Sequence, residues 1–177
     1  MDKEEKTLKS NLIYKGRIIN LYNDEIMCPN GHKAEREYIH HPGGVCILAT
    51  YNGYIYFIKQ FRYPYHKELL ELPAGKLEGK EDPKNAAMRE LKEEVGFTSL
   101  GLEYMGYFYP TCGYTDEVLY LYYSENNVLG SDNPDEDEIL EAIKLTPKEA
   151  YELLDNNKIE DGKTIILLEK LRNRLLK

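Results

Sequence analysis

Three glutamates gather within little more than one helical turn of the stretch Gly75–Phe97. On a helix that advances by about 100° per residue, Glu93 and Glu94 lie about 60° and 40° to either side of Glu90. The three carboxylates therefore form one arc at the rim of the helix's apolar stripe. That stripe is predicted to consist of Ala87, Met88, Leu91 and Val95.

Such an arc has a structural and a functional interpretation. Like charges at neighbouring helical positions cost about a few tenths of a kcal/mol per pair. A solvated face with charge pairs, such as Arg89 with Glu93 four residues on, would offset that cost. Alternatively, hard divalent cations such as Mg²⁺ bind a few carboxylates together with water and substrate phosphate. A bound cation would also offset the repulsion, so the arc is a candidate metal site.

Charge and composition exclude several classes of protein. The net charge of the 177-residue chain is −8, which argues against electrostatic binding of nucleic acid or anionic membranes. An anionic substrate would then need a positive mediator such as a metal ion. The start of the chain lacks the pattern of a secretory signal, and no apolar run approaches the roughly 20 residues of a membrane span. With three irregularly spaced cysteines, we expect a cytoplasmic protein with free thiols.

The elements around the arc follow from turn and helix signals. Asn30-Gly31 and Asn52-Gly53, each between β-rich runs, predict hairpins with type I′ turns. Asp82 as N-cap before Pro83 predicts the start of the acidic helix, and Gly96 its end. The expected strands are 16–28, 32–39, 44–51, 54–62, 102–109, 118–123 and 140–145, with later helices at 147–154 and 162–176. This order predicts an α+β, or mixed α/β, fold and not a doubly wound parallel sheet.

The acidic stretch resembles the Nudix box, whose pattern is G-x5-E-x7-R-E-apolar-x-E-E-x-G-apolar. The matching positions are Gly75, Glu81, Arg89, Glu90, Leu91, Glu93, Glu94, Gly96 and Phe97. The resemblance implies the Nudix fold, with a mixed β-sheet sandwiched between helices. It also implies hydrolysis of nucleoside diphosphates that are linked to another moiety, with Mg²⁺ or Mn²⁺ as the cofactor.

The resemblance assigns roles to individual box residues. Glu90, Glu94 and the backbone carbonyl of Ala74 would bind the metal. Glu93 would contribute to catalysis, and Arg89 would orient the box carboxylates by ion pairing. Gly75 is expected to permit the tight loop that brings the backbone near the metal.

Outside the box, the chain resembles the ADP-ribose pyrophosphatase branch of the Nudix family over roughly residues 12–172. The matching segments are Gly16–Val45, Lys59–Glu81, Tyr109–Glu117 and Asp135–Ala142. The resemblance implies Mg²⁺-dependent hydrolysis of ADP-ribose to AMP and ribose 5-phosphate. One departure is Cys112, which stands where the branch has the second proline of a substrate-contacting loop.

The branch resemblance adds four further site residues. Arg62 and Arg36 stand where the branch has arginines that contact the substrate, and a diphosphate suits such donors. Glu71 stands where the branch has a glutamate close to the metal and substrate. Glu138 resembles the acidic-loop glutamate proposed as general base. The register of that loop stays open between Glu136, Asp137 and Glu138.

Several alternatives remain open from the sequence. The substrate could instead be GDP-mannose or NADH, and a Nudix-fold module could bind ADP-ribose without hydrolysing it. Residues 1–40 resemble the β-strand module through which this branch forms homodimers and contacts the substrate, and residues 41–177 would form the Nudix hydrolase domain. We expect a homodimer that acts on a small molecule and binds neither nucleic acid nor membranes.

Overall fold

The computed structural model describes residues 3–130 and 141–177, which fall into two compact units. The N-terminal unit comprises Met1–Gly43 and Tyr109–Val118, and the main unit comprises Gly44–Phe108 and Leu119–Lys177. A loop that leaves the main unit after Phe108 thus belongs to the compact N-terminal unit.

The N-terminal unit is built on an antiparallel sheet. Its strands are β1 (Lys6–Lys9), β2 (Leu12–Lys15), β3 (Asn20–Met27) and β4 (Lys33–His40). β4 pairs with the whole of β3, from Asn20 opposite His40 to Met27 opposite Lys33, while β1 and β2 pair with separate parts of β3.

The turn of the β3–β4 hairpin differs from the predicted type. Of its two central residues, Gly31 has a positive φ of 85°, whereas Asn30 does not lie in the left-handed region. The backbone N–H of Gly31 donates to the carbonyl of Cys28 over 2.9 Å, and Cys28 N–H donates to His32. Pro29 explains this geometry, because its fixed negative φ favours a type I turn followed by a left-handed glycine. The predicted type I′ turn does occur at Asn52 and Gly53, where both φ angles are positive.

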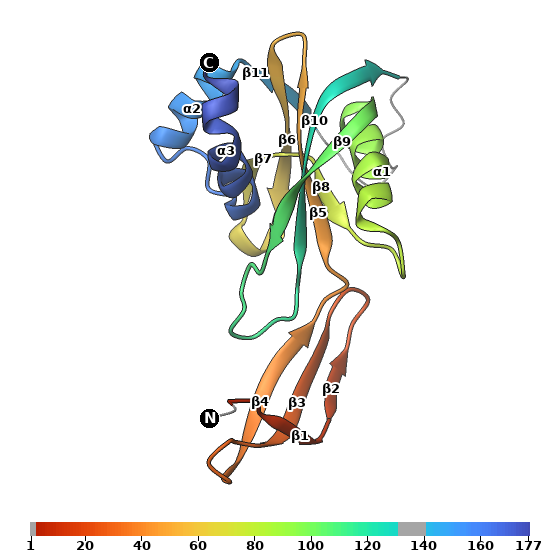
Figure 1. The fold of residues 1–177 in the computed structure, drawn as a ribbon, viewed down its shortest axis with the longest axis vertical. Helices are drawn as coiled ribbons and strands as arrows, with labels where there is room; N and C mark the ends of the chain where they lie inside the picture. Colours follow the sequence, from red (N-terminus) through yellow and green to blue (C-terminus); the bar gives the residue numbers. More distant parts are fainter. Residues whose placement is uncertain (1–2, 131–140) are drawn as a thin grey trace. The chain divides into compact units, whose positions relative to one another are not determined.

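The main unit is built on a mixed sheet with the order β11-β6-β5-β10-β9, with β7 beside β6 and β8 beside β5 (Figure 1). The strands are β5 (Gly44–Tyr51), β6 (Tyr54–Arg62), β7 (Lys67–Glu71), β8 (Ala74–Lys76), β9 (Phe97–Phe108), β10 (Leu119–Leu129) and β11 (Glu141–Leu145). β10 runs parallel to β5, and the other described pairings in this sheet are antiparallel. A short 3₁₀ helix, η1 (Tyr63–Tyr65), links β6 to β7.

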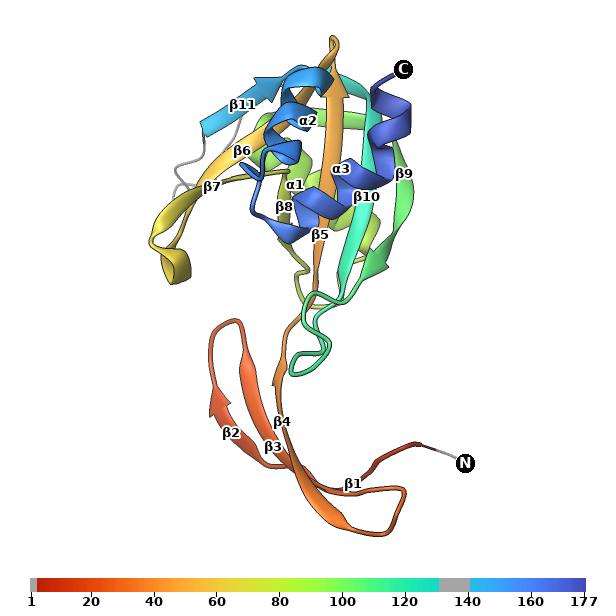
Figure 2. The same ribbon diagram turned by 90° about the vertical axis from the view of Figure 1, so that its left-hand side faces the viewer.

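Helices cover both faces of this sheet, as Figures 1 and 2 show together. On one face α1 (Pro83–Val95) buries Ala86, Ala87 and Leu91 against Val45 and Ile47 of β5. On the other face α2 (Pro147–Asp155) and α3 (Gly162–Leu175) pack against the opposite side chains of the central strands. That second core includes Cys46, Leu48, Phe57, Leu121, Tyr151, Leu167 and Leu168. The predicted sheet between helices is therefore confirmed.

The acidic helix begins and ends where the sequence predicted. The Asp82 carboxylate accepts the N–H groups of Lys84 and Asn85, and Gly96 ends the helix with a φ of 69°. The predicted apolar stripe was wrong at one position, because Met88 is 37% exposed, and Ala86 is buried in addition to Ala87, Leu91 and Val95.

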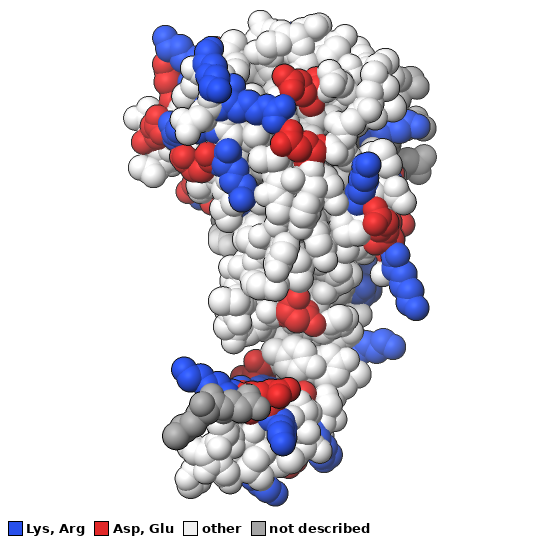
Figure 3. Space-filling model, viewed as in Figure 1, with Lys and Arg blue, Asp and Glu red and all other residues white. Residues whose placement is uncertain are grey.

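Charge on the described surface is mixed. On the face drawn in Figure 3, basic and acidic side chains lie next to one another and do not separate into patches of one sign. Among the ion pairs of the described residues, Arg172 contacts Asp155 and Glu169, and Arg174 contacts Glu103. None of the described helices is long and apolar enough to span a membrane.

Candidate active site

Arg89 joins the box carboxylates into one network. Its Nη1 donates to Glu90 over 2.7 Å and to Glu93 over 2.9 Å. Its Nε and Nη2 donate to the two carboxylate oxygens of Glu81, and Nη2 also reaches the carbonyl of Lys76 over 3.1 Å. The predicted pairing of Arg89 with Glu93 is thus present, and Arg89 additionally holds the loop before the helix to the helix itself.

These contacts shift the pKa values of Arg89 and Glu81. Hydrogen bonding by Glu81 and the charge of Glu90 raise the pKa of Arg89, although its partial burial opposes the shift. In return, hydrogen bonds from Arg89 lower the pKa of Glu81 below its ordinary value. Arg89 therefore stays charged and favours the ionised form of Glu81.

Gly75 leaves room for the carboxylate of Glu90. A Cβ atom built on Gly75 would overlap the carboxylate of Glu90. The φ of Gly75 is not in the left-handed region, so the tight loop expected from the sequence is not what demands glycine. The requirement is the space into which Glu90 projects from α1.

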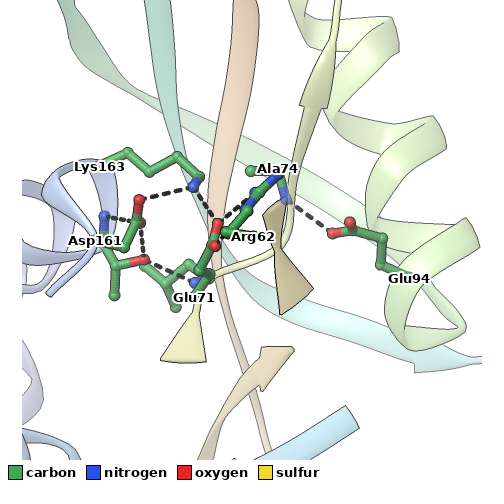
Figure 4. Close-up of polar contacts among 8 residues, drawn as sticks. Arg62, Glu71, Ala74, Glu94, Asp161 and Lys163 are labelled. Carbon is green, nitrogen blue, oxygen red and sulfur yellow. Dashed lines mark hydrogen bonds and ion pairs between the residues drawn. The ribbon is translucent and has the colours of Figure 1, made fainter. Parts of the chain in front are cut away.

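Glu94 lies one turn further along α1 and faces the same short strand. Its Oε2 accepts the backbone N–H of Ala74 over 2.8 Å, and only 9% of the residue is exposed (Figure 4). Glu90 and Glu94 therefore lie against two consecutive residues of β8, Gly75 and Ala74. Pairing of β8 with β5 holds this backbone in place, with Ala74 opposite Cys46.

The donor set suits a hard divalent ion. Within the ranges 3–130 and 141–177, no three His, Cys, Asp or Glu side chains are gathered closely enough to form a complete metal site. Mg²⁺ usually needs only one or two carboxylates, because water and substrate phosphate complete its octahedron. The oxygen atoms of Glu90 and Glu94, beside the backbone of Ala74, have the chemistry of such a partly formed site, whose ligands are all oxygen.

Arg62 and Glu71 form a second charged group beside the box. Nε and Nη2 of Arg62 donate to the two oxygens of Glu71, each over 2.6 Å. Glu71 is fully buried, whereas 36% of the Arg62 side chain is exposed. Burial raises the pKa of Glu71, but hydrogen bonds from Arg62 and the charge of Lys163 outweigh it, and the net shift is downward. The negative charge of Glu94 adds to the larger effect of Glu71 in raising the pKa of Arg62.

The remaining predicted site residues are not brought into this group by any described contact. Arg36 lies on β4 of the N-terminal unit, where its guanidinium pairs with Glu5 and with the carbonyl of Glu35. The candidate bases of the acidic loop, including Glu138, lie outside the described residues.

Three residues at the start of α3 were missed by sequence analysis. Lys163 donates to Glu71 and to Asp161, and Thr164 donates to Asp161 while accepting the N–H of Leu72 over 2.8 Å. Asp161 is also the N-cap of α3. In sequence these residues indicated only a helix start, because their partners lie about 90 positions earlier in the chain.

Comparisons with known proteins agree with the box and the fold. The NUDIX domain profile matches residues 40–168. The chain is 38% identical to an ADP-ribose pyrophosphatase of Bacillus subtilis over 172 residues, covering 96% of this chain and 93% of that protein. It is also 38% identical to a methanol dehydrogenase activator of Bacillus methanolicus, with 96% and 93% covered, and 28% identical to a GDP-mannose pyrophosphatase of Yersinia enterocolitica, with 93% of each covered.

A solved structure of another protein has the same fold as this chain. A crystal structure described as that of an ADP compounds hydrolase matches with a TM-score of 0.85, covering 98% of this chain and 95% of that one. Because the two sequences are only 19% identical, this likeness concerns the fold.

Proposed function

This chain belongs to the Nudix hydrolase family, and on that premise we propose that it hydrolyses the diphosphate bond of ADP-ribose to AMP and ribose 5-phosphate. The observation that carries the choice of substrate is the 38% identity to an ADP-ribose pyrophosphatase over nearly the whole of both chains. The chemistry is supported by a complete box whose glutamates lie against the backbone of β8.

We propose Glu90, Glu94 and the carbonyl of Ala74 as ligands of Mg²⁺ or Mn²⁺. When bound, such an ion lowers the pKa of water and offsets negative charge on the phosphate groups. It would supply the positive mediator that a chain of net charge −8 needs for an anionic substrate. Within the chain, Arg89 holds Glu90 in place, and the backbone N–H of Ala74 holds Glu94.

Arg62 is proposed as the donor to the diphosphate. Its Nε–Nη2 edge is occupied by Glu71, and among the described residues Nη1 has no hydrogen-bond partner. A guanidinium held along one edge offers the rest of its planar fork to phosphate oxygens. Arg36 is proposed as a second substrate contact, on its resemblance to an arginine of the ADP-ribose branch.

Glu138 is proposed as the general base that orients or deprotonates the attacking water. Its support is the resemblance of the acidic segment to that of the ADP-ribose branch. Glu138→Gln is expected to lower turnover by about 10²-fold with little change in metal affinity. Glu136→Gln and Asp137→Asn are the matched controls, and unchanged turnover in Glu138→Gln would place the base elsewhere.

A substrate panel tests the proposed function. Purified protein is incubated with ADP-ribose, GDP-mannose and NADH in Mg²⁺, with EDTA as control, and products are identified in ¹⁸O-water. The proposal predicts the highest kcat/KM for ADP-ribose, with AMP and ribose 5-phosphate as products and no turnover in EDTA. A higher kcat/KM for GDP-mannose or NADH would show that this compound, and not ADP-ribose, is the substrate. Binding of ADP-ribose without hydrolysis would indicate a sensor module.

A further inference from the structure

Four charged side chains form an alternating series that ends at the exposed side of Arg62 (Figure 4). Asp161 accepts from Lys163 over 2.9 Å, Lys163 donates to Glu71, and Glu71 accepts two bonds from Arg62. The four come from β6, β7 and the start of α3. The proposed function uses Arg62 and Glu71 but gives no task to Lys163 or Asp161.

The small exposed fraction of Lys163 shows that it is not an ordinary solvated surface lysine. Only 11% of its side chain is exposed, and its charge is compensated by Asp161 on one side and Glu71 on the other. A buried ammonium loses its hydration, so such a group persists only where nearby carboxylates hold it. Glu71 in turn carries two cations on one buried carboxylate.

The balance of charge in this series sets the potential near Arg62. With two cations and two anions the series is neutral overall. Without Lys163, the charges of Glu71 and Asp161 would exceed that of Arg62 by one negative charge. That excess would lie behind the guanidinium that is to face an anion, in a region where charges interact more strongly than in water.

The start of α3 is also fixed to the backbone that leads into β8. The Thr164 hydroxyl accepts the N–H of Leu72 over 2.8 Å and donates to Asp161 over 2.6 Å. Asp161 additionally caps α3 by accepting the N–H of Thr164. Lys163 therefore stands on a rigid element whose position relative to Glu71 is set by hydrogen bonds on either side of it.

We propose that Lys163 is a positioning residue for anion recognition. Its positive charge offsets the negative charge of Glu71, so that Glu71 can hold Arg62 by hydrogen bonds while Arg62 still presents its positive charge to a diphosphate. The proposal rests on the proposed function for the identity of the anion. It predicts that removing a positive charge from the series weakens binding of the anion, and that removing a negative charge strengthens it.

The test compares two single variants with opposite charge changes. Lys163→Met removes the partly buried cation, and Asp161→Asn removes the partly buried anion while keeping an N-cap of similar strength. The dissociation constant for inorganic pyrophosphate in Mg²⁺ is measured by calorimetry, and KM and kcat are measured with ADP-ribose. Lys163→Met is expected to weaken pyrophosphate binding about tenfold and Asp161→Asn to tighten it severalfold. KM should follow the same order, with kcat changed less than KM.

Lys170→Met is the matched control, because it removes one positive charge from an exposed position of the same helix and should leave the dissociation constant within about twofold of wild type. If both variants weaken binding alike, or if Lys163→Met matches wild type, the proposal is overturned. Should Lys163→Met fail to fold, Asp161→Asn decides alone, with tighter binding in favour and unchanged or weaker binding against. Failure of wild type to hydrolyse ADP-ribose would refute the substrate only, since the pyrophosphate comparison needs no turnover.

Discussion

At the scale of single residues, the carboxylate of Glu90 occupies the space beside Gly75. Because the carboxylate of Glu90 fills the position that a Cβ would take, the box glycine and the box glutamate depend on one another. Arg89 donates to the same carboxylate over 2.7 Å. The conformation of Glu90 is therefore set by sterics and by an ion pair together.

Replacing Gly75 by alanine is expected to displace Glu90 and lower kcat/KM by about 10²-fold, a typical loss when a metal site's supporting contacts are removed. The matched control is Gly101→Ala, because a Cβ there meets nothing within 4 Å and Gly101 has no positive φ. Steady-state kinetics and thermal unfolding of both variants make the comparison. Near-normal activity in Gly75→Ala would contradict the steric account.

Sequence spacing predicted the box contacts that lie within a helix and missed those that depend on tertiary structure. The arc of Glu90, Glu93 and Glu94 and the Arg89–Glu93 pair follow from helical geometry alone. The contact of Lys163 with Glu71 does not, since it joins residues 92 positions apart. No local pattern indicates which buried carboxylate a lysine at a helix start will meet.

At the scale of elements, the Glu71 carboxylate joins three of them. It lies at the end of β7, receives Arg62 from the end of β6 and receives Lys163 from α3. Breaking a buried ion pair from one side leaves the partner charges without compensation, which costs about 3–5 kcal/mol. This carboxylate should therefore matter to stability as well as to binding.

Glu71→Gln is expected to lower the free energy of unfolding by about 3–5 kcal/mol at pH 7. The folded pKa of Glu71 lies below its ordinary value of 4.5, so the stabilisation is complete above pH 4.5 and is lost as pH falls through the folded pKa. Denaturant titrations from pH 7 to pH 3 should thus show the two proteins converging in acid. Glu152→Gln, on an exposed part of α2, is the control, and a pH-independent gap would contradict the argument.

The strongly signalled elements were predicted well, whereas the short strands β1, β2, β7 and β8 were missed. The two longest strands were predicted too short, because β9 already begins at Phe97 and β10 continues to Leu129. Helix α1 has its cap at Asp82 and its stop at Gly96, both visible in the sequence. β7 was missed because its sequence, KELLE, is rich in Lys and Glu, which are depleted in strands, and β8 was missed because it contains Gly75 and has only three residues. Its strand character comes from pairing with β5, a tertiary contact that outweighs local propensity.

At the scale of the whole molecule, the N-terminal unit exposes several large apolar side chains. The exposed side chains are Leu8, Leu12, Ile13, Tyr14, Ile18 and Ile19. Exposed apolar surface of this kind is typical of a protein–protein interface. We propose that it forms part of a homodimer interface.

Ile13→Glu tests this interface. Ile13 is 59% exposed on β2, so the change should leave the fold intact and weaken self-association at least tenfold by placing a charge in an apolar contact. Leu100→Glu, at a 72% exposed position of β9, is the control and should not change the oligomeric state. Sedimentation velocity at micromolar concentration measures both. A wild type that sediments only as monomer would refute the dimer.

The measurement that bears most directly on the account is divalent-ion binding beside α1. Crystals soaked with Mn²⁺ and a non-cleavable ADP-ribose analogue are examined by anomalous diffraction, with Glu94→Gln in parallel and its turnover assayed. We predict an ion within about 2.0–2.2 Å of Glu90, Glu94 and the carbonyl of Ala74 in wild type. In Glu94→Gln, the ion should be weakened or lost and turnover should fall by at least about 10²-fold. No ion at these residues in the wild-type complex, or near-normal turnover of Glu94→Gln at saturating metal, would contradict the account.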